Sequence, residues 1–457
     1  MQDMIGFALA GGSGMRAWPM SLEGPGHVRS KAVMRFLGQP VVEWLIKNFK
    51  SQGLSDYLMV VLGKENRYQI KRIAGYGEPF GVTIRYSPVR YDALNSGSAD
   101  AVMQNLANPM WEGSVVVFPT DMILEVDLAR MLEFHLQSEA AVTVGYQNLR
   151  ADQIAGTYGL MVMDRRGMVV RFLEKPSWEG MQEGLGRKDL AGATALPTST
   201  GFYLMDAAQV REIGQLPEVR QMRQERFDIG GDLLPWLVKR GYSVYGFPIE
   251  AAGDLGSFPA YLATMRRALS GGFNSLNRLM GEPFDRDRLI WIDQETLATK
   301  DSMGRSLLAR IRRGEVRIKG KVRIGRFVTL GSGVNLEESN LDDECQVESD
   351  VGITGCSLGE GTMVGQGATL SEVVTGLMVQ IDSSPEEPTR LEGMVALGDE
   401  VIVEKGVQVR GPLCAHPKVV IPQGCDVPLK AEMTTSAEAA ERLRLRESLR
   451  AGRQTTY

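Results

Sequence analysis

Histidine and cysteine are scarce in this chain, which contains three histidines and four cysteines in 457 residues. The histidines, His27, His135 and His416, are scattered along the sequence, so we expect no active site centred on histidine. No two cysteines form a Cys-x-x-Cys pair, and this spacing predicts no zinc site. Any chemistry is therefore expected to rest on carboxylates, lysine, arginine and backbone amides.

A large excess of one charge and long apolar runs are also lacking. The 51 basic and 56 acidic residues give a net charge of −5, which argues against nucleic acid or a membrane surface as a partner. No apolar run reaches the roughly 20 residues that a membrane-spanning helix needs, and the N-terminus shows no signal-peptide pattern. Together with cysteines interpreted as reduced thiols, these features predict a cytoplasmic protein of two or more globular domains.

Up to about residue 270, short apolar strands alternate with amphipathic helices. Several strands are near-continuous apolar runs, as expected for a sheet that is covered on both faces. This alternation predicts a mostly parallel, open α/β sheet that binds ligands at the carboxyl ends of its strands. The expected strands are Met4–Ala10, Tyr57–Leu62, Val82–Tyr86, Val115–Phe118, Ala140–Tyr146, Tyr158–Met163, Gly201–Met205 and Tyr242–Phe247.

From about residue 316 the apolar period changes to six. A triangular coil with three short sides has this period, whereas a helix or an ordinary β-sandwich does not. The period resembles the hexapeptide repeat of left-handed β-helices, and residues 371–395 are expected to interrupt the coils. The repeated aliphatic positions are Ile318, Ile324, Leu330, Leu336, Leu341, Val347, Ile353, Leu358, Val364 and Leu370, followed later by Leu397, Val403 and Val409.

A glycine-rich segment directly follows the first predicted strand. Its glycines allow a tight turn that brings backbone amides against phosphate oxygens. Arg16 at the end of the segment is suited to bind phosphates that leave during a reaction. A glycine turn after a strand also occurs for purely structural reasons, so the segments after it decide its interpretation. The residues of this segment are Leu9, Ala10, Gly11, Gly12, Ser13, Gly14 and Met15, for which the family resemblance given next implies nucleotide binding.

A series of further segments resembles, in order, the signature of the sugar-phosphate nucleotidylyltransferase family, of the ADP-glucose pyrophosphorylase or mannose-1-phosphate guanylyltransferase type. The resemblance covers about 270 residues, and a left-handed hexapeptide-repeat β-helix is a common appendage of this family. The matching segments are Trp18–Ser21, Ser30–Val33, Leu37–Pro40, Gly97–Val102, Val115–Asp121, Tyr158–Gly159, Val170–Pro176, Thr200–Tyr203, Phe227–Asp228, Asp232–Pro235 and Gly253–Ser257.

The resemblance implies a reaction between two polyanions, in which a sugar phosphate attacks the α-phosphorus of a nucleoside triphosphate. Positive side chains and a divalent cation, Mg²⁺, are implied to offset the repulsion between the phosphates. The phosphate nucleophile is already ionised, so the scarcity of histidine is consistent with this chemistry. The implied residues are Arg16 and Lys31 for catalysis, Gly97 and Ser98 for the nucleotide, Gly159, Glu174, Lys175 and Thr200 for the sugar phosphate, and Asp121 and Asp254 for the metal.

The expected enzyme is a sugar-1-phosphate nucleotidylyltransferase, either glucose-1-phosphate adenylyltransferase-like or mannose-1-phosphate guanylyltransferase-like, that produces a nucleotide-sugar and pyrophosphate. Its expected partners are these substrates and further copies of the chain or a paralogous subunit, without nucleic acid or membrane. The expected domains are an open, mostly parallel Rossmann-like nucleotidyltransferase sheet in residues 1–270, a connecting helical segment in 271–315, a left-handed parallel β-helix in 316–430 and a C-terminal helical tail in 431–457.

Two other functions stay open at this point. A non-catalytic regulatory subunit or ligand-binding relative would keep the fold, but we would expect it to lose Asp121, Asp254, Lys31 or Lys175, and all four are present. A β-helix that transfers acyl groups would need a histidine base near a coil junction, and His416 alone lies in that region. The sequence leaves the nucleotide base and the sugar undecided.

Overall fold

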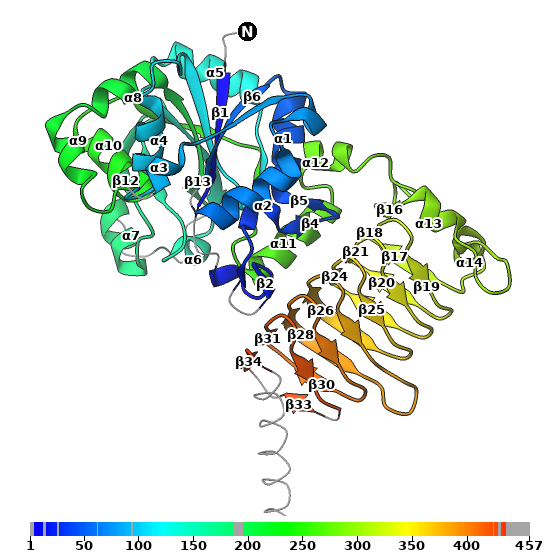
Figure 1. Cartoon of the computed structure of the whole chain (residues 1–457). Helices are drawn as coiled ribbons and strands as arrows, with labels where there is room; N and C mark the ends of the chain where they lie inside the picture. The colour runs from blue at the N-terminus through cyan, green and yellow to red at the C-terminus, as the bar shows by residue number, and fades with distance from the viewer. Residues whose placement is uncertain are drawn as a thin grey trace, which may run out of the picture. The chain divides into compact units, whose positions relative to one another are not determined.

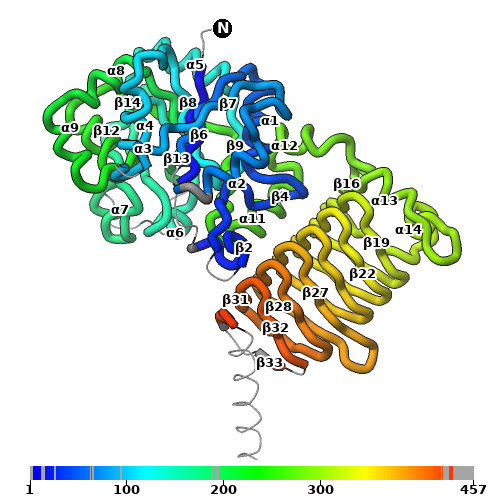
Figure 2. The backbone as a smooth tube through the Cα atoms, in the orientation of Figure 1, coloured from blue at the N-terminus to red at the C-terminus, as the bar shows by residue number. Residues whose placement is uncertain are grey.

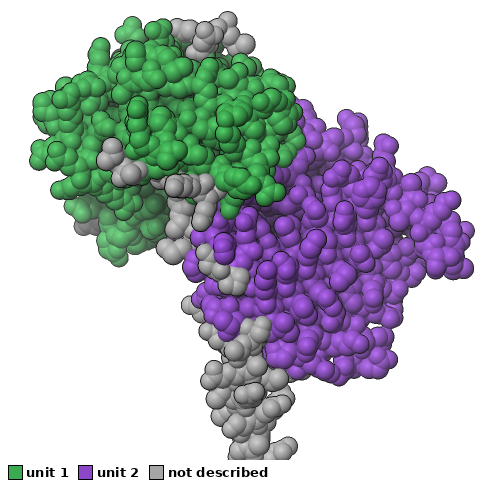
Figure 3. All heavy atoms as spheres, in the orientation of Figure 1, with its two compact units in different colours: residues 1–12, 42–252 green, residues 13–41, 253–457 purple. Residues whose placement is uncertain are grey.

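The computed structural model describes residues 4–11, 15–24, 27–61, 63–92, 95–186, 190, 195–423, 425–427 and 431–435. The chain divides into two compact units, which Figure 3 colours green and purple. The first unit contains residues 1–12 and 42–252, and the second contains residues 13–41 and 253–457. Residues 13–41 therefore belong to the same compact unit as the C-terminal coils. The end of the nucleotidyltransferase domain at residue 270 stays a prediction.

A nine-stranded sheet forms the centre of the first unit (Figure 1), and its core strands are parallel. β1 (Met4–Ala10) lies between β6 (Asp56–Val61) and β8 (Ser114–Pro119), and β7 (Thr83–Tyr86) follows β6. β1 has the bounds predicted from its apolar run, and Phe7 within it is fully buried. The prediction of an α/β fold with a parallel-dominated sheet is confirmed.

The rest of this sheet contains antiparallel pairs that the sequence did not indicate. β13 (Leu196–Asp206) pairs antiparallel with β8, with β10 (Val142–Leu149) and with β11 (Leu160–Met163). β12 (Val169–Leu173) pairs antiparallel with β11, whereas β14 (Val244–Pro248) is parallel to β10. An apolar run predicts that a strand is buried, but it does not fix the direction of its neighbours.

Helices of the first unit begin where the sequence provides starting signals. α1 (Val41–Ser51) begins directly after Pro40, and the apolar side chains on one of its faces are buried, namely Val42, Leu45, Ile46 and Phe49. α5 (Leu128–Gln137) is capped by Asp127, whose side chain accepts the Arg130 N–H at 3.0 Å. The other α-helices are α2 (Lys64–Ala74), α3 (Val89–Asp92), α4 (Ser98–Leu106), α6 (Ala151–Ile154), α7 (Trp178–Leu185), α8 (Ala207–Ile213), α9 (Pro217–Met222) and α10 (Leu234–Lys239).

Stacked coils form most of the second unit (Figure 2), and parallel ladders of short strands run along their sides. Arg317 pairs with Asn335 and Asn335 with Gly352, so one turn of the chain takes three of the repeats. The first ladder contains β17 (Arg317–Gly320), β20 (Asn335–Glu337), β23 (Gly352–Thr354), β26 (Thr369–Thr375), β28 (Arg390–Leu397), β30 (Gln408–Arg410) and β33 (Asp426–Val427).

Two further ladders complete the triangle, and β26 and β28 bend to join the first ladder to the second. The second ladder adds β16 (Ile290–Ile292), β18 (Val322–Ile324), β21 (Asn340–Leu341), β24 (Ser357–Leu358), β31 (Leu413–Ala415) and β34 (Ala431–Met433). The third contains β19 (Thr329–Leu330), β22 (Gln346–Val347), β25 (Met363–Val364), β27 (Gln380–Ile381), β29 (Ile402–Val403) and β32 (Val420–Ile421).

The predicted interruption of the coils at residues 371–395 is shorter than the sequence suggests. β26 and β28 run through much of this segment and pair Thr369 with Arg390 and Val373 with Val395. Val373, Leu391 and Val395 are fully buried. The apolar core therefore continues across this segment even though the six-residue period fails there.

The segment before the coils is partly helical, as expected, and contains α12 (Asn274–Leu279), α13 (Gln294–Ala298) and α14 (Leu307–Arg312). Ile290, Ile292 and Leu307 from this segment extend the buried core of the coils. The helix expected from Ser436 to Arg450 lies outside the described residues. Within the part of the chain that is described, no helix has the length and apolar character that crossing a membrane requires.

The segment between residues 15 and 41 packs on the coils. Its elements are η1 (Met15–Ala17), β2 (Leu22–Gly24), β3 (His27–Val28), η2 (Lys31–Val33), β4 (Arg35–Phe36) and β5 (Gln39–Pro40). Tyr261 of α11 (Phe258–Leu269) donates its hydroxyl to the Arg35 carbonyl at 3.0 Å, and the same hydroxyl oxygen lies 3.2 Å from Ser357 Oγ. Arg35 also forms an ion pair with Asp342 at 3.4 Å. One segment thus contacts both α11 and the coils.

Candidate active site

The carboxyl ends of β1 and β8 meet at one edge of the sheet in the first unit. Leu9 and Ala10 end β1, and Gly11 follows them as an exposed residue. After β8, Thr120 donates its N–H and its hydroxyl to the Leu9 carbonyl, at 3.2 and 3.0 Å. This double contact fixes the backbone beside Asp121, which lies half-buried at the edge where such sheets bind ligands.

The glycine-rich segment is only partly described. Gly12, Ser13 and Gly14 lie outside the described residues, so the phosphate-binding turn expected there stays a prediction. Met15 and Arg16 belong to the second unit and lie in η1, where Arg16 is exposed.

Gly97 and Ser98 lie at the start of α4. A Cβ on Gly97 would come within 2.4 Å of the Phe227 carbonyl oxygen, so a larger residue there would displace backbone. Ser98 donates its N–H and its hydroxyl to Asp228 Oδ1, at 3.0 and 3.2 Å, and its hydroxyl accepts the Ile229 N–H at 2.9 Å. The Ser98 hydroxyl is thus engaged within the protein, and Asp228 holds the segment in place.

Asp228 is a further candidate site residue for which the sequence indicates no role, although it belongs to one of the matching segments. Burial raises the pKa of its carboxyl, but hydrogen bonds from Ser98 and Arg226 outweigh burial and hold the pKa below its usual range. The group is therefore ionised at neutral pH, and a negative charge is favourable at the N-terminus of α4.

Gly159 and Glu174 converge because β11 and β12 are neighbours. Leu160 pairs with Leu173, which sets Gly159 opposite Glu174. A Cβ on Gly159 would lie 3.0 Å from Glu174 Oε2, and a Cβ on Gly230 would lie 2.5 Å from the same oxygen. The carboxylate therefore fits between two glycines, and the sequence carries no signal that would have identified Gly230.

Lys175 and Thr200, the other residues predicted to bind the sugar phosphate, differ in exposure. Lys175 Nζ lies 3.6 Å from Glu174 Oε1, and the lysine side chain is 48% exposed. Burial raises the pKa of the Glu174 carboxyl, and the Lys175 charge offsets part of this rise. Thr200 is buried and donates its hydroxyl to the Gly145 carbonyl at 2.8 Å. Of the two, Lys175 is the residue that can meet an anion.

The second unit brings Lys31 and Asp254 together. Lys31 opens η2, and Asp254 is the last residue of β15 (Ala251–Asp254). Asp254 Oδ1 accepts the Gly256 N–H at 2.6 Å. A Cβ on Gly256 would lie 2.8 Å from that oxygen and 3.6 Å from Lys31 Nζ. An ammonium group, which suits phosphate, and a carboxylate, which suits a cation, thus lie at one glycine-lined position.

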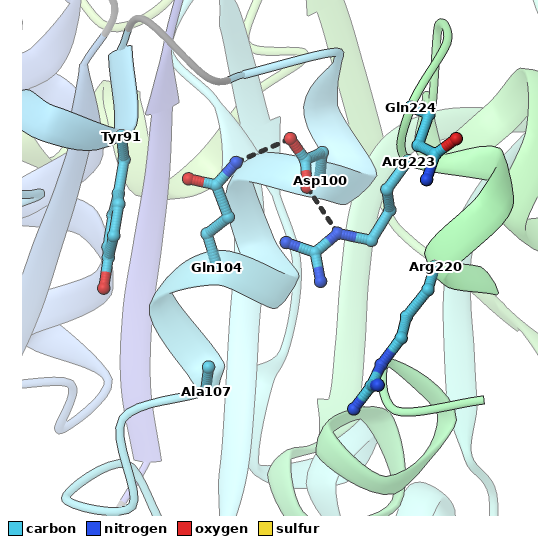
Figure 4. A pocket seen from close by; sticks show the side chains of 7 residues that line it. All are labelled: Tyr91, Asp100, Gln104, Ala107, Arg220, Arg223 and Gln224. Atoms are coloured by element: carbon cyan, nitrogen blue, oxygen red, sulfur yellow. Dashed lines mark hydrogen bonds and ion pairs between the residues drawn. The ribbon is translucent and has the colours of Figure 1, made fainter. Parts of the chain in front are cut away.

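A separate hollow of about 410 Å³ lies beside α4 in the first unit (Figure 4). Asp100 in its wall is buried and accepts hydrogen bonds from Arg223 Nε at 2.6 Å, Gln104 Nε2 at 2.6 Å and the Ser96 N–H at 3.0 Å. Asp100 therefore connects the lining of the hollow to Ser96, the residue that precedes Gly97. The lining residues are Tyr91, Asp100, Gln104, Ala107, Arg220, Arg223 and Gln224.

Comparison with known proteins gives a family and several relatives. The family model described as "Nucleotidyl transferase" matches residues 5–271, which is more than half of the chain. A UTP–glucose-1-phosphate uridylyltransferase of Synechocystis sp. is 27% identical over 282 residues, which cover 59% of this chain and 64% of the relative. A glucose-1-phosphate adenylyltransferase of Nitrosococcus oceani is 25% identical over 405 residues, which cover 80% of this chain and 89% of the relative.

A third relative, glucose-1-phosphate adenylyltransferase 1 of Vibrio cholerae, is 28% identical over 258 residues, which cover 54% of this chain and 60% of the relative. The chain therefore spans slightly less than two thirds of the Synechocystis and Vibrio proteins, and most of the Nitrosococcus protein.

Proposed function

The chain belongs to the nucleotidyl transferase family, and on this premise we propose that it transfers a nucleotidyl group from a nucleoside triphosphate to a sugar 1-phosphate. The names of the relatives support this reaction type. The observation that carries the proposal is the convergence of Lys31 and Asp254 at Gly256, because two phosphate-bearing reactants need both an ammonium group and a cation-binding carboxylate. A screen of nucleoside triphosphates against sugar 1-phosphates for pyrophosphate release tests the proposal and identifies the base and the sugar.

Positive side chains carry out most of the proposed chemistry. The sugar phosphate oxygen attacks the α-phosphorus, and pyrophosphate leaves from the opposite side. Negative charge must therefore be stabilised on the sugar phosphate, on the α-phosphate and on the leaving pyrophosphate. Lys31 stabilises the α-phosphate, Arg16 the departing pyrophosphate and Lys175 the incoming sugar phosphate. The nucleophile is already ionised, and no residue needs to act as a general base.

Nucleotidyltransferases of this family generally use a divalent metal, and we propose that Asp121 and Asp254 hold Mg²⁺. The donors suit it, because Mg²⁺ prefers oxygen ligands and keeps several waters. Asp254 is already oriented by the Gly256 N–H. When bound, the ion neutralises phosphate charge.

Lys175→Ala is expected mainly to raise the KM for the sugar phosphate, and Arg16→Ala mainly the KM for the nucleotide. The reason is that each side chain meets a different anion, so its loss affects one substrate. Steady-state kinetics with each substrate varied in turn provides the measurement, and Arg150→Ala, at an exposed arginine outside the site, is the control. Exchange of the two effects would contradict both assignments.

Asp100→Asn is expected to raise the KM for the nucleotide roughly tenfold while leaving the KM for the sugar phosphate nearly unchanged. The substitution weakens the hold on Ser96 and removes the charge opposite Arg223, a loss of about 1–3 kcal/mol. Both KM values should be measured together with Glu225→Gln, which alters an exposed carboxylate nearby. An equal rise in both KM values would indicate general loosening of the fold instead of positioning of the Gly97 segment.

We also propose, from the sequence, how the chain associates and where it works. The first proposal is that copies of the chain, or the chain and a paralogous subunit, associate through the coils, whose stacked faces offer extended surfaces. The second proposal is that the protein works in the cytoplasm, where its four free thiols would stay reduced.

A further inference from the structure

Three potential metal ligands lie together on two neighbouring coils near the end of the β-helix. Cys414 in β31 pairs with Glu432 in β34, and His416 follows Cys414 by two residues. The Cys414 sulfur, a ring nitrogen of His416 and a carboxylate oxygen of Glu432 all lie within 4.8 Å of one another. Among the residues that the structure describes, no other group of three or more histidine, cysteine or acidic side chains converges in this way.

The parallel pairing of the strands explains the convergence. Leu413 and Ala415 are buried in the core of the coil, so Cys414 between them points outward. Glu432 occupies the paired position one coil later, and His416 Nε2 lies 3.0 Å from its Oε1. The strand backbone thus holds the three side chains on one surface, which is the rigid support that a binding site needs.

We propose that Cys414, His416 and Glu432 bind one divalent cation of the zinc class, with water as the fourth ligand. Zinc accepts thiolate, imidazole and carboxylate together in four-coordinate sites. Its bonds of about 2.0–2.3 Å set tetrahedral ligand atoms roughly 3.3–3.8 Å apart, so small side-chain rotations bring these atoms into position. A search for Cys-x-x-Cys spacing misses this site, because one ligand lies on the next coil.

Two other interpretations account for less of the arrangement. A Cys–His–Glu triad uses both ring nitrogens of the histidine, one toward the thiol and the other toward the carboxylate. Here a single ring nitrogen lies within 4.8 Å of both the sulfur and the carboxylate oxygen, which is the arrangement of ligands around one ion. An ion pair between His416 and the exposed Glu432 contributes little and gives Cys414 no role. Only a bound cation uses all three groups.

The site adjoins the segment that carries Arg16. The Trp18 and His416 rings meet edge to face, with their centroids 5.4 Å apart. A cation that fixes the imidazole therefore also limits the movement of Trp18, two residues after Arg16. We expect bound zinc to raise the unfolding temperature of the protein. This inference concerns the coils and holds whether or not the chain performs the proposed transfer.

The test uses the intact chain, stripped of metal with a chelator and titrated with Co²⁺ or Zn²⁺ in the absence of nucleotide. The expected result is one equivalent of cobalt that produces the absorption band of charge transfer between cobalt and a thiolate. Cys414→Ser should abolish the band, and Glu432→Gln should weaken binding by about tenfold or more, since even outer-shell changes reach that size.

The matched controls are His27→Gln and Glu400→Gln, at exposed residues outside the cluster, and both should bind like the unmodified chain. Glu432 is exposed, so its variant is expected to fold and keeps the test decisive if other variants unfold. Absence of the thiolate band in the unmodified protein, or unchanged affinity in Glu432→Gln, overturns the proposal. Cobalt held by aspartates alone gives no thiolate band, so this result is independent of the proposed Mg²⁺ site.

Discussion

Replacing Asp121 or Asp254 by asparagine is expected to lower turnover by about 100-fold or more. Asparagine keeps the size of the side chain but removes the charge that would hold the cation, and stabilisation of phosphoryl charge by a metal is worth several kcal/mol. The double variant is expected to lose little more than either single variant, because both carboxylates serve the same ion. Pyrophosphate release at increasing Mg²⁺ measures the effect, and Mn²⁺ binding by electron paramagnetic resonance gives a second readout that does not depend on turnover.

Asp152→Asn is the control for these variants, since Asp152 is an exposed aspartate paired with Arg150 on the surface. It should leave turnover and Mn²⁺ binding unchanged. Near-normal turnover in either Asp121→Asn or Asp254→Asn would contradict the shared cation. An unmodified chain that is inactive with every pair of nucleotide and sugar phosphate would instead favour the regulatory-subunit interpretation.

Breaking the ion pair between Arg29 and Asp399 is expected to destabilise the second unit, by about 3–5 kcal/mol in Arg29→Gln, because the buried Asp399 carboxylate loses this cation. Asp399→Asn is expected to cost less, because Arg29 keeps Glu23 at 3.9 Å. The Arg29 and Asp399 side chains are only 12% and 8% exposed. Arg29 Nη1 lies 3.3 Å from Asp399 Oδ1, and that oxygen also accepts the Leu377 N–H at 3.0 Å. Arg29 precedes Lys31 by two residues, so loosening this contact should also lower turnover.

Thermal unfolding and pyrophosphate release of Arg29→Gln, Asp399→Asn and the double variant measure this contact. The double variant should lose less than the sum of the two single losses, because the partners are directly coupled. Glu400→Gln is the control, since Glu400 forms an exposed pair with Lys418 that is worth about 0–1 kcal/mol. Strictly additive losses would show that the ion pair does not hold the segment on the coils.

The coils are the part of the fold that the sequence predicted best. Ile318, Leu336 and Ile353 were identified from their spacing alone, and each is buried in the core of the coils. Each coil places its aliphatic residues at the same inward positions, so their spacing in the sequence is enough to predict which side chains pack in the core. Where extra residues enter the repeat, as between β26 and β28, the period fails although the core continues, and only the strand pairing shows this.

The candidate site was predicted in part. The order of the matching segments along the chain is enough to identify Asp121, Glu174 and Lys175 as candidates. It does not indicate that Gly230 makes room for the Glu174 carboxylate, nor that Asp228 engages the Ser98 hydroxyl. These contacts join residues from different elements, and no motif or spacing in the chain records them.

The amino-acid sequence was enough to establish an α/β sheet followed by triangular coils, and to name the charged groups of the proposed reaction. Tertiary structure alone decided which polar side chains from distant segments meet: Lys31 with Asp254 at Gly256, Arg29 with Asp399, and Cys414 with His416 and Glu432. The reason is physical. Periodicity reports whether a side chain faces the core of its own element, whereas contacts between polar groups on distant elements depend on the packing of the whole unit and leave no periodic trace.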